Sequence, residues 1–258
     1  MFDVASLCSK LKALMNIIRV ATYNIHKGVQ GLGPARRLEI HNLGLAVESL
    51  DADVVCLQEV RHSNRLEAKR FPRWPELAQA EFLAPQGYEA VYRTNAITRH
   101  GEHGNALLSR WPVLGHQHED MSDHRLEQRG FLHVSLDVHG QMVHVLVVHL
   151  GLVKASRARQ VAQLQRFIQR EIPASAPLLV AGDFNDWGTS VQLALAQTGL
   201  HAWAESVPTF PSRLPLAQLD YVFARGLKPL GLMVPRGRIW GQMSDHLPLI
   251  AEFALPVT

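Results

Sequence analysis

Short apolar runs that end on polar residues recur along the whole chain. Their apolar composition predicts strands that are buried inside a sheet. A hairpin turn at 137–140 joins two of them. The predicted strands are 17–25, 53–60, 88–92, 103–109, 129–138, 141–148, 178–181, 218–224, 227–235 and 247–255.

Three stretches have helical spacing instead. Apolar residues recur every three or four positions over 38–50, which predicts a helix with one buried face. Ser156 is expected to cap a second helix that continues to about Gln169. A third helix is expected to begin at Thr189 or Ser190 and to end near Gly199.

The run 178–181 is followed at once by a carboxylate and a carboxamide, Asp183 and Asn185. Side chains two positions apart on an extended backbone point to the same side, so both are expected to reach one common point. Oxygen ligands of this kind suit a hard divalent cation, or a water or phosphate beside one. An Asx-type turn after a strand is the alternative explanation.

Polar residues follow the other predicted strands as well. Singly, each has an ordinary explanation as a helix cap, a buried histidine or the partner of an arginine. Together they indicate a site, because loops at strand ends are where α/β proteins carry their chemistry. The residues are Asn24, Glu59, Asn105, His149, Asp183, Asn185, Asp220, Asp245 and His246.

Composition adds limits. The chain has 258 residues, 47% hydrophobic and 19% charged, with a formal net charge of +3. This composition is that of a globular protein and permits an anionic substrate. We expect an N-terminal tail or short helix over 1–16 and a single domain over 17–258. Cys8 and Cys56 offer no disulfide framework. No apolar stretch approaches the roughly 18 residues of a membrane span, and a cytoplasmic location is expected.

Two further segments are charged or rich in histidine. The basic stretch 61–74 is expected to be a solvated helix or loop, with a phosphate-facing loop as the alternative. His116, His118, Asp120 and His124 match no closed zinc pattern, so an exposed loop is expected there.

The order of the motifs resembles the endonuclease/exonuclease/phosphatase superfamily. The resemblance implies an α/β (α+β) fold, a four-layer sandwich of two packed mixed β-sheets flanked by helices. It also implies hydrolysis of a phosphoester that depends on Mg²⁺ or Mn²⁺. Its motifs are Thr22–Asn24, Leu57–Val60, Gly104–Ala106, Val148–Leu150, Gly182–Asn185, Leu219–Tyr221 and Ser244–Pro248.

The resemblance also implies roles on the metal side of the site. Glu59 would be the main metal ligand, with Asn24 and Asp245 near or on the ion. Asp183 would orient or deprotonate the attacking water, and Asn185 would hold that water or a phosphate oxygen. The cation is needed because a phosphodiester repels hydroxide and has a poor leaving group.

Other residues would surround the phosphate. His246 would contact it while Asp220 fixes the histidine's tautomer and favours its charged form. His149 would lie on the other side as a donor to the phosphate oxygens or the leaving group. Asn105 would donate to a phosphate oxygen, and Arg129 would add positive charge or form a structural ion pair.

The substrate is less determined than the chemistry. A nuclease is the first expectation, with the substrate a phosphodiester such as nucleic acid, and no obligate protein partner is evident. A sphingomyelinase-like lipid or small-molecule phosphodiesterase is the alternative. A non-catalytic binding protein on the same fold, or a zinc hydrolase that uses the surplus histidines, is less consistent with the full set of acids and with the histidine spacing.

Overall fold

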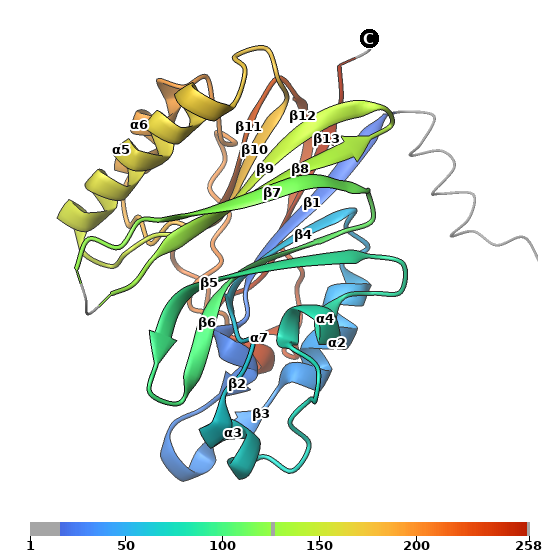
Figure 1. Cartoon of the computed structure of the whole chain (residues 1–258), viewed down its shortest axis with the longest axis vertical. Helices are drawn as coiled ribbons and strands as arrows, with labels where there is room; N and C mark the ends of the chain where they lie inside the picture. The colour runs from blue at the N-terminus through green and yellow to red at the C-terminus, as the bar shows by residue number, and fades with distance from the viewer. Residues whose placement is uncertain (1–15, 125–126, 257–258) are drawn as a thin grey trace, which may run out of the picture.

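The computed structural model describes residues 16–124 and 127–256. The expected N-terminal tail or helix and Cys8 therefore lie outside the described residues, apart from Asn16. Two large mixed β-sheets pack face to face, with helices on their outer faces (Figure 1). The sequence-based expectation of two mixed sheets flanked by helices is confirmed.

One large sheet has six strands in the order β12-β13-β1-β4-β6-β5. Its central pair, β1 and β4, is parallel, and the other neighbours are antiparallel. The strands are β1 (Ile17–Asn24), β4 (Val54–Val60), β5 (Glu89–Thr98), β6 (Gly101–Ser109), β12 (Lys228–Met233) and β13 (Leu249–Ala254).

The other large sheet has five strands in the order β11-β10-β9-β8-β7, of which only β9 and β10 are parallel neighbours. A small sheet pairs β2 (Val29–Gln30) with β3 (Arg37–Leu38). The five strands are β7 (Val113–Asp120), β8 (Gly130–Val138), β9 (Gln141–His149), β10 (Leu178–Asp183) and β11 (Asp220–Arg225).

The helices cover the two outer faces. Buried residues of α2 and α4 pack on the six-stranded sheet, and buried residues of α5 and α6 pack on the five-stranded sheet (Figure 1). The helices are η1 (His26–Gly28), η2 (Gly33–Ala35), α2 (Ile40–Ser49), α3 (Arg65–Arg70), α4 (Gln79–Leu83), α5 (Lys154–Glu171), α6 (Ser190–Ala196) and α7 (Trp240–Met243).

The core between the sheets places the polar strand ends. Along β10, Leu179 and Ala181 belong to the core between the sheets, whereas Leu178 and Val180 face the helices. Because side chains alternate along a strand, Asp183 falls on the same inner face as Ala181. The same count places Asn24, Asn105, His149 and Asp220 on inner faces.

Glu59 is the exception to this alternation. Its neighbours Val55 and Leu57 face the helices, so a regular strand would direct Glu59 outward with them. Instead the β4–β6 register shifts between Leu57 and Val60, and Glu59 adopts a left-handed backbone with φ of 57°. Val60 returns to the helix-facing cluster. The bulge thus takes Glu59 out of the alternation, which is how bulges re-aim side chains near sites.

Two local predictions were wrong. The histidine-rich segment is mostly β7, an edge strand, and not a loop; its exposed polar residues on both faces had hidden the strand pattern. Ser156 does not cap α5, which begins two residues earlier at Lys154; Ser156 is buried and donates a hydrogen bond to Asp123. The short helix α3 agrees with the helix-or-loop expectation for the basic stretch.

Candidate functional site

Register brings three polar residues of the five-stranded sheet into one row. Asp183 at the end of β10 pairs with Asp220 of β11 on one side and with His149 of β9 on the other. His149 Nε2 lies 3.6 Å from Asp183 Oδ2. Burial lowers the pKa of His149 well below its usual value, and the charge of Arg129 lowers it further, so the ring is neutral.

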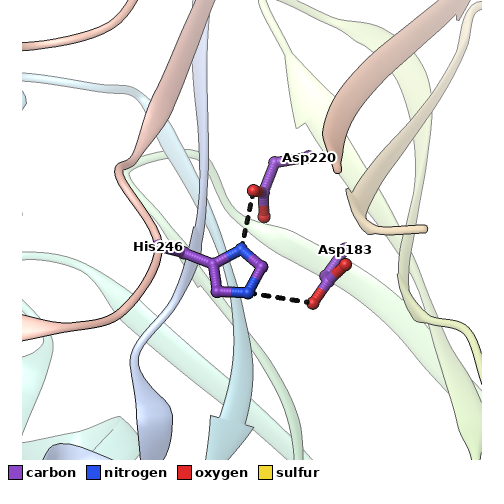
Figure 2. Close-up of side chains that lie close together, drawn as sticks. All are labelled: Asp183, Asp220 and His246. Carbon is purple, nitrogen blue, oxygen red and sulfur yellow. Dashed lines mark hydrogen bonds and ion pairs between the residues drawn. The ribbon is translucent and has the colours of Figure 1, made fainter. Parts of the chain in front are cut away.

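His246 joins this row from the loop before β13. Its Nδ1–H donates to Asp220 Oδ2 at 2.8 Å, and its Nε2 lies 3.6 Å from Asp183 Oδ2 (Figure 2). Thr209 donates to the same Asp220 oxygen at 2.6 Å. Burial opposes protonation of the ring, but the charges of Asp220 and Asp183 prevail and raise the pKa of His246 to about 10. The imidazole is therefore a cation that can donate from Nε2.

Asp183 is the point where the contacts converge. Asn24 Nδ2 donates to its Oδ2 at 3.0 Å, across from the other sheet, and the main-chain N–H of Asn185 donates to its Oδ1 at 3.0 Å. Burial is the main cause that raises the pKa of Asp183, to about 7, against the lowering effect of His246. Such a carboxylate can accept a proton near neutral pH.

Asn185 reaches the site in a way that sequence alternation did not predict. Its backbone is left-handed, with φ of 49°, so it does not continue the extended strand beyond Asp183. Its side-chain amide donates to the carbonyl of Leu150 at 2.9 Å, next to His149. The amide thereby joins the loops after β9 and β10, and the expectation that strand geometry alone directs it beside Asp183 was wrong.

A second cluster lies at the ends of β1 and β4. Lys27 Nζ is 2.8 Å from Glu59 Oε2, and His26 Nδ1 is 3.2 Å from Asp245 Oδ1 and 4.0 Å from Glu59 Oε2. Burial works to raise the pKa of Glu59, but Lys27, His149 and His26 outweigh it and hold that pKa far below its usual range. Both carboxylates are thus ionised; Lys27 pairs with Glu59, and the His26 ring lies within 4.0 Å of both carboxylates.

The donor set of this second cluster fits a divalent cation. Glu59 Oε2 and Asp245 Oδ1 lie 4.0 Å and 3.2 Å from the same ring nitrogen of His26, so both residues place carboxylate oxygens around one imidazole. Oxygen ligands of this kind are those Mg²⁺ prefers. Asp183, Asp220 and His246 also lie within 4.8 Å of one another, but there His246 Nδ1 and Asp220 already hydrogen-bond each other.

Asn105 and Arg129 have structural contacts that differ from the phosphate-binding expectation. Both hydrogens of the Asn105 amide are donated, to the carbonyls of Gly130 at 3.0 Å and Val147 at 3.1 Å. Asn105 is fully buried and so ties β6 to the opposite sheet, with no N–H left for a phosphate. Arg129 pairs with Glu127 at 3.1 Å, as the alternative of a structural ion pair anticipated.

Sequence reasoning did not single out Lys27, His26 or Thr209. Lys27 and His26 follow Asn24 within three positions, and both adopt positive φ, 61° and 46°, in a turn that the sequence marked only by its glycines. Thr209 comes from a loop with no periodic pattern, eleven positions before Asp220. Closeness in the chain to Asn24 could have pointed to Lys27 and His26 as site residues, but no comparable signal exists for Thr209.

Residues 21–246, which include the whole candidate site, match the endonuclease/exonuclease/phosphatase family. The chain belongs to this family, whose members are generally phosphoesterase hydrolases and are typically dependent on divalent metals.

The described part of the chain contains no helix that meets the length and hydropathy of a membrane span.

Individual relatives agree with this assignment. The chain is 37% identical to the YbhP protein of Escherichia coli over 246 residues, which covers 92% of this chain and 96% of that protein. A conserved protein from Enterococcus faecalis has a similar structure, with a TM-score of 0.72 at 22% identity over 93% of this chain and all of that one. The catalytic domain of human Nocturnin, solved with a bound sulfate, gives 0.70 at 21% identity over 93% and 94%.

Proposed function

We propose that this protein is a divalent-metal-dependent phosphodiesterase, and specifically a nuclease that hydrolyses nucleic-acid phosphodiesters. The observation that carries the proposal is the convergence on Asp183. One buried carboxylate contacts Asn24 from one sheet, His149 from the other and His246 from a loop. Family membership supplies the reaction class, and this geometry supplies the residues for it.

In this proposal the chain's own residues divide the work. Asp183 accepts the proton of the attacking water, a role that its raised pKa permits. His246, held in one tautomer by Asp220, directs its protonated Nε2 toward the phosphate oxygens. The neutral His149, on the opposite side of Asp183, hydrogen-bonds the phosphate or the leaving oxygen.

Glu59 and Asp245, with Asn24 beside them, would hold Mg²⁺ or Mn²⁺. A cation bound there would neutralise charge on the phosphate and the leaving oxygen. Lys27 pairs with Glu59, and His26 lies beside both Glu59 and Asp245. The chain therefore carries its own positive charge at the position where the cation's charge is needed.

Aromatic side chains next to His246 support a nucleic-acid substrate. The ring of Phe210 lies 4.9 Å from that of His246, and Trp187 packs edge-on against Phe210 at 6.0 Å. Trp187 is 68% exposed, so its ring is available to stack on a base.

The basic stretch 61–74 supports a nucleic-acid substrate less well. Arg61 is buried and lies 3.7 Å from Glu67, a carboxylate that also pairs with Arg36. Part of the stretch's positive charge is therefore neutralised within the fold, which leaves less of it to meet a phosphate backbone.

A lipid or small-molecule phosphodiesterase is the second candidate. Leu214 and Leu216 are 66% and 73% exposed on the loop that also carries Thr209. Exposed apolar side chains beside a site suit a substrate with an apolar part.

The deciding assay compares three substrates: plasmid DNA, sphingomyelin and bis-p-nitrophenyl phosphate, each with Mg²⁺, Mn²⁺ or EDTA. We expect metal-dependent cleavage of the plasmid and of the small diester, both absent in His246→Ala. Cleavage of sphingomyelin without cleavage of DNA would replace the nuclease by the lipid hydrolase. Metal binding without turnover of any substrate would contradict the catalytic proposal.

A further inference from the structure

A cavity of about 650 Å³ opens beside the loop that carries His246. Its volume falls within the range of small-ligand pockets. Three of its lining residues are arginines, Arg213, Arg236 and Arg238, and none of its lining residues is acidic. A concave surface with several guanidinium groups and no carboxylate is complementary to an anion.

The arginines are free to meet a ligand. All three are exposed, and among the described residues no ion pair engages them. Arg213 Nε donates to the carbonyl of Gly241 at 3.3 Å, which fixes its side chain at the cavity wall. Guanidinium groups bind phosphate oxygens through paired N–H donors, which makes phosphate the anion best matched to this cavity.

The cavity is tied to the candidate active site by hydrogen bonds. Ser212, in its wall, donates from Oγ to the carbonyl of Ser244 at 2.6 Å and from its N–H to the carbonyl of Asp245 at 2.7 Å. Leu247, also in the wall, directly follows His246. The cavity wall therefore includes the chain neighbour of His246, the residue proposed to contact the scissile phosphate.

We propose that Arg213, Arg236 and Arg238 form a second phosphate subsite, which binds a backbone phosphate of a nucleic-acid strand next to the phosphate that is cleaved. The inference rests on the proposed nuclease function and deepens it. A strand presents a regular row of phosphates, so holding one of them in the arginine cavity aligns its neighbour with His246 and Asp183.

The subsite makes the enzyme distinguish substrates by their number of phosphates. Bis-p-nitrophenyl phosphate has one phosphate and cannot occupy both positions, whereas an oligonucleotide can. The arginine contacts then strengthen binding of the oligonucleotide and leave the small diester unaffected.

The test is binding of a fluorescein-labelled oligothymidylate of about eight nucleotides, followed by fluorescence anisotropy in EDTA so that no turnover is required. We expect the double variant Arg236→Ala/Arg238→Ala to bind about tenfold more weakly. We also expect a shallower slope of log affinity against log salt concentration, by about 0.7 for each phosphate contact that is lost. The matched control is Arg166→Ala/Lys228→Ala, two exposed cations away from the cavity, which should bind like the parent at moderate salt.

Kinetics supply the second readout. In the Arg236→Ala/Arg238→Ala variant, KM for the oligonucleotide should rise about tenfold while hydrolysis of bis-p-nitrophenyl phosphate stays unchanged. Equal affinity and salt slope in parent and variant would overturn the subsite, as would arginine-dependent binding to phosphoinositide vesicles with none to the oligonucleotide. Arginine-dependent oligonucleotide binding without hydrolysis would support the subsite and reject the nuclease activity.

Discussion

The two halves of the candidate site are built differently. On the five-stranded sheet, Asp183 and Asp220 are fully enclosed and joined to His246 by close contacts. At the ends of β1 and β4 the arrangement is more open: Asp245, whose side chain is 41% exposed, meets His26, and Glu59 meets Lys27 through a partly buried ion pair.

The difference follows from what each half is proposed to do. A proton-transfer group needs a fixed position and a perturbed pKa, and burial among hydrogen-bond partners provides both. A metal site needs carboxylates that stay ionised and can exchange a partner, and partial exposure of this half favours that exchange because partly solvated ion pairs cost less to break than fully buried ones. The predictions below test that contrast.

Removing the histidine of the enclosed half should have the largest effect. His246→Ala deletes the proposed donor to the phosphate and removes the imidazole that Asp220 holds, so turnover should fall by hundreds-fold or more. Hydrolysis of bis-p-nitrophenyl phosphate at saturating metal measures this. Far-ultraviolet circular dichroism controls for folding. Full activity in the folded variant would reject the assignment.

Removing the carboxylate of the open half should act through the metal. Glu59→Ala should lower turnover by hundreds-fold and weaken Mg²⁺ binding, because the main proposed ligand is gone. Isothermal titration calorimetry measures the affinity without any substrate. Normal Mg²⁺ affinity in this variant would place the ion elsewhere, for instance among Asp183, Asp220 and His246.

Removing Lys27 should have the opposite effect on the metal site and strengthen Mg²⁺ binding. Its ammonium lies 2.8 Å from Glu59, where it neutralises the charge that a divalent cation would meet. Lys27→Met removes this competitor, so Mg²⁺ should bind several-fold more tightly, while Lys27→Arg should resemble the parent. The rise of the melting temperature with Mg²⁺ concentration reports the affinity. Weaker Mg²⁺ binding in Lys27→Met would show that Lys27 supports the ion instead of competing with it.

The smallest effect on the site is expected from the buried pair His133 and His144, which lies outside it and changes stability instead of activity. Burial, with the charge of His144, lowers the pKa of His133 to about 4, and the two rings hydrogen-bond each other at 3.0 Å. Between about pH 6.5 and 4, His133 is protonated in the unfolded chain but stays neutral in the folded protein. The free energy of unfolding should therefore fall as the pH drops from about 6.5 to 4, by roughly 2 kcal/mol at this residue.

Urea unfolding at pH 7 and pH 4.5 measures that loss. The comparison variant is His133→Gln, which keeps a polar side chain but has no group that titrates in this range. Its loss of stability on acidification should be smaller than that of the parent, and an equal loss would assign the effect to other groups.

Much of the fold was predictable because burial imposes a period on the sequence. Strands such as β9 and β10 are apolar on both faces, and their last inner position, His149 or Asp183, is where the pattern turns polar. The edge strand β7 was missed for the converse reason. It has few buried positions, so burial leaves no alternation to detect.

The candidate site was predictable only where position along a strand decides it. Asp183, His149 and Asp220 are fixed by register, and their contacts follow from pairing that the sequence pattern indicates. Glu59 and Asn185 depend on left-handed backbone at non-glycine residues, which no periodicity reveals. The ion pairs of Lys27 and His26 depend on the path of one turn, and Thr209 on a loop, so tertiary structure alone assigns them.

The hydrogen bonds of Asn105 have a consequence for how the molecule tolerates change. The groups proposed to act in catalysis and metal binding come from opposite sheets, and Asn105 links those sheets beside them by donating from β6 to carbonyls of Gly130 and Val147. The thickness of the sandwich is thus part of the active-site geometry. Packing mutations between the sheets are therefore expected to change turnover even where they alter no polar residue of the site.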